Sequence, residues 1–122
     1  MRNVMISAIC IGLLACYAEA NAVFAHFMVG NTAHYTQGTW ETEMSLAQGS
    51  RIDAFALNVA AAESMNEDQI GFAFKAAQAR GFKLLFSFDC AGGREGGWTP
   101  AEVLALLRTY GTQGASSTTT CL

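Results

Sequence analysis

The sequence predicts an α/β fold made of three strand–helix units. Three apolar runs have strand character, and each is followed by a segment with helical signals; the runs are Ala22–Gly30, Ile52–Ala60 and Phe82–Cys90. Phe-Ala or Phe-Ser pairs recur in these runs 31 residues apart. That period is the size of one strand–helix unit in a βαβ chain. Strands apolar on both faces fit a parallel sheet covered by helices on one face and by a core on the other.

The first helix is predicted after the first strand. Thr39 is its expected N-cap, because a threonine hydroxyl accepts from the free backbone N–H groups of the first turn. Trp40, Met44 and Ala47 follow at helical spacing and form a core stripe, and Gly49 is the expected end.

The second and third helices carry capping signals. Ser64 and Glu67 have the spacing of a capping box, and Gly81 ends the apolar stripe that follows. The third start, Thr99–Glu102, combines a threonine cap, a proline in the first turn and a glutamate at the third position. Gly111 ends this helix. The predicted order is therefore βαβαβα with parallel strands.

The repeat suggests a (β/α)8 (TIM-type) barrel, but the chain is long enough for only the first three of its eight strand–helix units. Such a barrel needs about 250 residues, whereas this chain has 122. The predicted organisation is a signal peptide at 1–20, a partial catalytic-barrel domain at 21–111 and a disordered tail at 112–122, which is polar and unperiodic.

The signal peptide is predicted from three features. Arg2 gives a positive start, Val4–Cys16 is apolar, and Ala18, Glu19 and Ala20 give the small-x-small cleavage pattern. The apolar run is shorter than the roughly 20 residues of a membrane span. We therefore expect a secreted protein, extracellular or in the cell wall, with no membrane association after cleavage.

Charge and cysteine content exclude further classes. The formal charge of −3 and the scattered basic residues argue against nucleic-acid binding, which needs a basic surface. Cys90 and Cys121 remain after signal cleavage, and whether they pair stays open. The sequence has no C-x-x-C or H-E-x-x-H spacing, so we expect no metal site and no cofactor.

Candidate site residues follow the strands, because working groups in βα folds gather at the carboxyl ends of strands. Asn58 and Asp89 are equivalent by the 31-residue repeat and are expected to point into a barrel mouth. Both also have an alternative interpretation as loop caps that bind backbone N–H groups. Asn31 and Tyr35 follow the first strand, and Trp98 follows the third.

This combination of side chains favours a sugar ligand. Sugar hydroxyls bond to amides and carboxylates such as Asn58 and Asp89, and aromatic rings such as Tyr35 and Trp98 cover the apolar side of a sugar ring.

Three runs resemble glycoside hydrolase family 71, the secreted fungal endo-α-1,3-glucanases called mutanases. They are FAHFMVGNT (Phe24–Thr32), IDAFALN (Ile52–Asn58) and GFKLLFSFD (Gly81–Asp89), and the similarity covers about Val23–Gly111. Cys90 departs from the family, since similar sequences usually carry an apolar residue there. The tail resembles nothing in the family.

The resemblance implies a (β/α)8-type catalytic barrel that hydrolyses the polysaccharide α-1,3-glucan with inversion. Inversion needs an acid and a base carboxyl about 6.5–9.5 Å apart. Family members are much longer, so the catalytic residues are expected beyond residue 122. The chain then holds substrate-binding positions only: Asn31, Tyr35, Asn58, Asp89 and Trp98.

The sequence leaves two alternatives to an α-1,3-glucanase. The chain is a non-catalytic secreted glucan-binding remnant or inactive truncated gene product, or it belongs to a different barrel glycosidase that shares the early strands.

Overall fold

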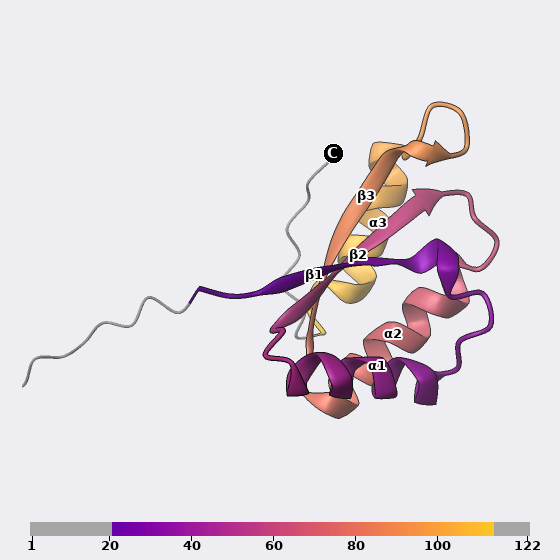
Figure 1. Ribbon diagram of the computed structural model, residues 1–122. Helices are drawn as coiled ribbons and strands as arrows, with labels where there is room; N and C mark the ends of the chain where they lie inside the picture. Colours follow the sequence, from indigo (N-terminus) through magenta and orange to yellow (C-terminus); the bar gives the residue numbers. More distant parts are fainter. Residues whose placement is uncertain (1–20, 114–122) are drawn as a thin grey trace, which may run out of the picture.

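The computed structural model describes residues 21–113. The predicted signal peptide lies outside them, as do residues 114–122 of the predicted tail and with them Cys121. Three strands alternate with three helices, and a short 3-10 helix, η1 (Val29–Asn31), follows the first strand (Figure 1). The elements are β1 (Phe24–Met28), α1 (Gln37–Gly49), β2 (Ala54–Ala61), α2 (Asn66–Arg80), β3 (Lys83–Gly93) and α3 (Pro100–Tyr110). The α/β class and the element order are confirmed.

The sheet is parallel in the order β1-β2-β3, but its register differs from the 31-residue repeat. Asn58 pairs with Met28 on one side and with Ser87 on the other, whereas Asp89 pairs with Ala60. The predicted equivalence of Asn58 and Asp89 is therefore wrong. Asp89 lies two positions further along the sheet, although on the same face.

Phe24 shows why the repeat misleads. It aligns with Phe55 in sequence, yet Ala25 is the residue that pairs with Phe55. Because a one-residue shift moves a side chain to the other face of a sheet, Phe24 is 55% exposed while Phe55 is 4% exposed.

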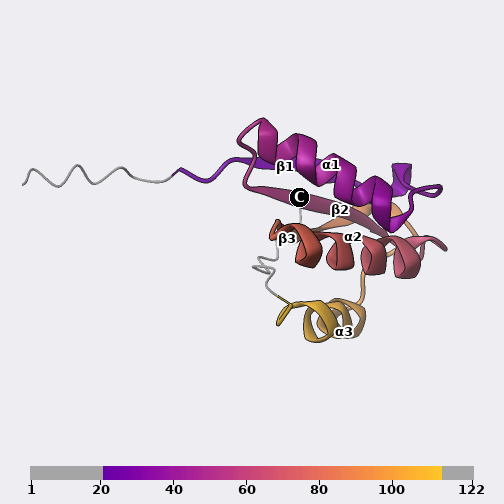
Figure 2. The same ribbon diagram turned by 90° about the horizontal axis from the view of Figure 1, so that it is seen from below.

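One face of the sheet holds the core beneath the helices. Phe55, Phe86 and Phe88 are buried there. Full burial of a side chain of this size stabilises a fold by about 1.5–3 kcal/mol. The three helices lie side by side in the order α1, α2, α3 (Figure 2). Helix α1 packs through Trp40, whose ring lies 4.9 Å from Phe27, and α2 packs through Phe74, whose ring lies 5.4 Å from Phe86.

The opposite side of the sheet, called the open face below, carries small and polar residues in its middle and two exposed apolar side chains on β1. Its members are Phe24, His26, Met28, Ala54, Ala56, Asn58, Ala60, Lys83, Leu85, Ser87 and Asp89. All the ring contacts that join helices to the sheet lie on the other side.

The start of α1 differs from the prediction. Thr36 is the N-cap: its hydroxyl accepts from the Thr39 backbone N–H at 3.2 Å, and the Thr39 hydroxyl accepts from the Thr36 N–H at 3.4 Å. Thr39 is therefore the third helical residue. The two threonines form the capping box with each other, so the helix begins one turn earlier than expected.

The start of α2 also differs. Met65 precedes the helix without a side-chain cap, so the predicted Ser64–Glu67 box is wrong. Asn66, the first helical residue, instead donates from Nδ2 to the Ala60 carbonyl at 2.8 Å, which fixes the helix start to the end of β2.

Two other helix signals are confirmed. Gly81 ends α2 with φ 61°, in the left-handed region that suits glycine. The Thr99–Glu102 capping box of α3 forms with both of its hydrogen bonds. Among residues 21–113, no helix has the length and apolar character needed to cross a membrane.

Candidate functional site on the open face

Asn58 lies in the middle of the open face. Strand β2 continues to Ala61, so Asn58 is inside the strand and the loop-cap alternative for it is wrong. Its neighbours along the same face of the strand are Ala56 and Ala60. Methyl groups leave space above the sheet, so a half-buried amide between them can exchange hydrogen bonds with a ligand.

Asp89 lies one step nearer the carboxyl edge of the sheet. Its Oδ1 accepts from the backbone N–H groups of Ala91 and Gly92, both at 2.9 Å. These bonds favour the ionised form and lower the pKa of Asp89. The loop-cap interpretation is therefore confirmed for this oxygen. A Cβ on Gly92 would lie 2.5 Å from Oδ2, so a larger residue at this position would displace the Asp89 carboxylate.

The loop after Asp89 leaves the sheet through a bulge. Ala60 pairs with Asp89 but Ala61 pairs with Gly93, which leaves residues 90–92 looped out. The Arg94 backbone N–H then donates to the Ala61 carbonyl at 3.1 Å. Figure 1 shows this segment projecting beyond the other two strands. The loop therefore lies at the carboxyl edge of the sheet, directly after Asp89.

Arg94 holds the base of that loop. Its guanidinium donates to both carboxylate oxygens of Glu102, at 3.1 and 2.8 Å, and to the Gly97 carbonyl at 2.8 Å. Hydrogen bonds from Arg94 and then from Thr99 lower the pKa of Glu102 to about 2, and the same pairing raises the pKa of Arg94. The ion pair therefore connects the loop to the first turn of α3.

Tyr35 lies on the helix-covered side, away from Asn58. Its ring makes edge contacts with Phe27 at 6.5 Å and Trp40 at 5.6 Å. Its hydroxyl donates to Glu43 Oε1 at 3.4 Å, and burial followed by the Glu43 charge raises the pKa of Tyr35. The structure does not bring this ring to the open face.

Trp98 also lies on the helix side. Its indole N–H donates to the Val59 carbonyl at 3.0 Å, and its ring meets Phe88 edge-on at 5.2 Å. Asn31 is exposed at the end of η1, directly beyond β1. Of the five predicted residues, the structure therefore places Asn58 and Asp89 on one face, puts Asn31 at the same edge, and separates the two aromatics from them.

Comparison with known proteins identifies the family. The model of glycosyl hydrolase family 71 matches residues 19–120. The chain belongs to this family. A mutanase of Penicillium rubens is 44% identical over 78 residues, which are 64% of this chain and 18% of that protein. A glucan endo-1,3-alpha-glucosidase of Schizosaccharomyces pombe is 42% identical over 69 residues, 55% of this chain and 16% of that protein. No solved structure matches.

This family 71 chain thus spans less than a fifth of the length of these relatives. It also has a carboxylate at the carboxyl edge of the sheet that is not among the five predicted site residues. Glu63 follows β2, and its Oε2 is enclosed without a hydrogen-bond partner; a Cβ on Gly30 would lie 3.2 Å from it. Its position directly after a strand is the signal that points to it. Within residues 21–113 no group of His, Cys, Asp or Glu is placed to hold a metal ion.

Proposed function

We propose that this chain is the N-terminal part of a secreted enzyme that hydrolyses α-1,3-glucan with inversion, and that its three units continue into a (β/α)8 barrel. Family membership supports the reaction class, and the two relatives are a mutanase and a glucan endo-1,3-alpha-glucosidase. The short span of this chain within those relatives supports the proposal that more units follow.

The open face is the observation that carries the proposal. It has small side chains around Asn58, and its β1 edge exposes Phe24 and Met28, which are 55% and 49% exposed. Exposed apolar groups on a sheet face mark a surface that another part of a protein covers. In a closed barrel these residues face the interior, with Asn58 and Asp89 toward the mouth.

Within that barrel, Asn58, Asp89 and Asn31 are proposed to bind glucan hydroxyls. The amide of Asn58 both donates and accepts, and the Asp89 carboxylate accepts. Inversion needs two carboxyl groups, whereas the open face in the described range holds one, Asp89. The acid and base are therefore proposed to lie on later strands, and this chain positions substrate for them.

The alternative is a non-catalytic secreted glucan-binding remnant or inactive truncated gene product, and the single carboxylate on the open face within residues 21–113, Asp89, favours it. One experiment distinguishes the two proposals. The native protein is incubated with insoluble α-1,3-glucan, and both the bound protein and the released reducing ends are measured. Hydrolysis supports the first proposal. Binding without release supports the alternative, and release from another polysaccharide alone supports the different barrel glycosidase.

The site is tested in the same assay. We expect Asn58→Ala to lower the rate of hydrolysis at least ten-fold, because a ligand hydroxyl loses its amide partner. Gln78→Ala, on the exposed side of α2, is the control and should leave the rate unchanged. Equal rates for the two variants would remove Asn58 from the site.

A further inference from the structure

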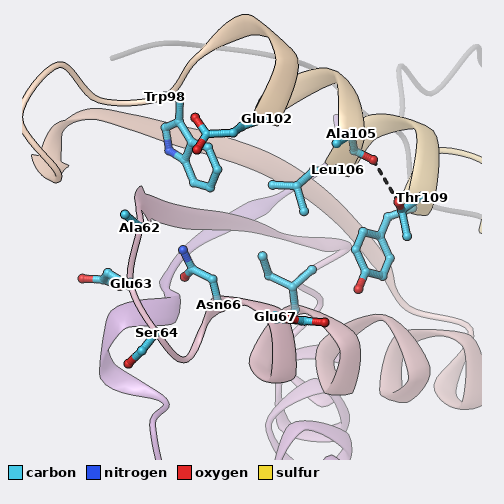
Figure 3. Close-up of a pocket in the computed structure, with 12 residues that line it drawn as sticks. Ala62, Glu63, Ser64, Asn66, Glu67, Trp98, Glu102, Ala105, Leu106 and Thr109 are labelled. Carbon is cyan, nitrogen blue, oxygen red and sulfur yellow. Dashed lines mark hydrogen bonds between the residues drawn. The ribbon is translucent and has the colours of Figure 1, made fainter.

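A cavity lies on the helix side of the sheet, away from the open face. It is a cleft of about 470 Å³ between α2 and α3 (the α2–α3 cleft), within the range of about 300–1,000 Å³ typical of small-molecule sites. Figure 3 shows Trp98 and Leu106 directed from the α3 side toward Asn66 on the α2 side. Ile70 and Tyr110 complete its apolar lining.

The polar groups of the cleft are mostly acceptors. Asn66 is a buried residue whose Nδ2 is already bonded to Ala60, while its Oδ1 has no donor. A buried acceptor without a donor is costly and is the kind of group that a ligand hydroxyl satisfies. Glu67 adds a carboxylate. A ligand that fits the cleft must therefore carry hydrogen-bond donors for Asn66 Oδ1 and the Glu67 carboxylate.

Charge excludes the main competing ligand classes. None of the twelve lining residues, all in the described part of the chain, is basic, so the cleft offers an anion no cationic side chain. Glu102 is already paired with Arg94 at 2.8 Å, and Figure 3 shows Glu63 directed away from Trp98. Of the three lining carboxylates, Glu67 is the one that is neither paired with a basic residue nor turned away from the cleft, and a single carboxylate is too little to select a cation. An uncharged ligand rich in hydroxyl groups fits best.

We propose that the α2–α3 cleft is a second, non-catalytic binding site for a glucose unit of the glucan chain. The sugar ring packs against Trp98 and Tyr110, and its hydroxyls donate to Asn66 Oδ1 and Glu67. This inference rests on the proposed function for the identity of the sugar. Such a site holds the polysaccharide on the outer side of the helices while the open face works on the chain.

The test is an NMR titration of the ¹⁵N-labelled full chain with α-1,3-linked glucotriose. We expect shifts at the Trp98 indole N–H and at the amides of Ala105 and Leu106. Ala105 is exposed and lines the cleft, so Ala105→Arg obstructs it without disturbing the core. Leu104→Arg adds the same charge at a neighbouring residue that is 49% exposed and outside the cleft.

Affinity at the cleft signals should fall at least ten-fold in Ala105→Arg and stay unchanged in Leu104→Arg and Asn58→Ala. Shifts confined to the open face would overturn the cleft proposal and leave the proposed function intact. Equal losses in the two arginine variants would overturn it, as would shifts at the cleft with tetramethylammonium but not with the sugar. An absence of sugar-induced shifts would also overturn the cleft proposal. The hydrolysis assay on the native protein tests the proposed function separately.

Discussion

Gly93 determines how the chain leaves β3. Its φ of 76° lies in the left-handed region, and a Cβ there would overlap the Ala61 backbone carbonyl. A left-handed residue with a side chain costs about 1–2 kcal/mol, and the overlap adds to that. We expect Gly93→Ala to lower the free energy of unfolding by about 2 kcal/mol or more, measured by urea denaturation.

Gly49 is the matched control for this prediction. It is the last residue of α1, and a Cβ built on it meets nothing within 4 Å. Gly49→Ala should leave the stability unchanged or slightly higher, since alanine favours helix. If the two variants behave alike, the bulge after Asp89 does not need its glycine.

The Arg94–Glu102 pair predicts a pH dependence. Binding to Arg94 and Thr99 lowers the pKa of Glu102 from 4.5 to about 2. A carboxyl with a lower pKa in the folded state contributes stability above its unfolded pKa and loses it as pH falls through the folded value. The stability difference between wild type and Glu102→Gln should therefore be constant above about pH 5 and shrink toward pH 2.

Arg94→Gln provides the control for this pH dependence. In that background, Glu102→Gln should show a much weaker dependence, because the main cause of the lowered pKa is gone. Both groups are substantially exposed, so added salt should reduce the effect. A pH-independent difference between wild type and Glu102→Gln would contradict the observed pairing.

At the scale of elements, α1 and α2 are joined by a buried polar bridge. The Trp40 indole N–H donates to Gln69 Oε1 at 2.9 Å, and Gln69 Nε2 donates to the Tyr35 carbonyl at 3.1 Å. Gln69→Leu would leave the Trp40 N–H buried without an acceptor. We expect this substitution to lower the free energy of unfolding by about 1–3 kcal/mol.

Gln78→Leu is the control on the same helix, because Gln78 is exposed. Its effect should stay within about 0.5 kcal/mol. Thermal or urea unfolding of both variants gives the comparison. A neutral Gln69→Leu would show that the bridge adds nothing to helix packing.

These elements also show what sequence can predict. The third helix start was predictable because Thr99, Pro100 and Glu102 each act locally. The cap of α2 was not, because Asn66 reaches back to Ala60 and satisfies the strand end instead. Trp40 was predictable as helix core from its spacing, but Gln69 was not, since its burial depends on a partner 29 residues away.

In the candidate site too, local features were predictable from the sequence and features that depend on distant partners were not. Alternation along a strand was enough to put Asn58 with its alanines and Asp89 with Ser87. The register between strands was not available from the repeat, because it depends on how neighbouring strands pair. Tyr35 and Trp98 follow strands in sequence, yet apolar packing turns both rings to the helix side.

At the scale of the whole molecule, the three units leave the open face without a covering layer. We propose that later units of a family 71 barrel supply that layer and the catalytic carboxylates. In this proposal the described residues position substrate at the carboxyl edge and, through the α2–α3 cleft, hold the glucan chain.

The decisive measurement is the intact mass of the protein isolated from its native source. We expect a mass far above the 13.0 kDa of the 122 residues, because the barrel and its catalytic pair require a longer polypeptide. A mass slightly below 13.0 kDa, as signal cleavage of this chain alone would give, would contradict it.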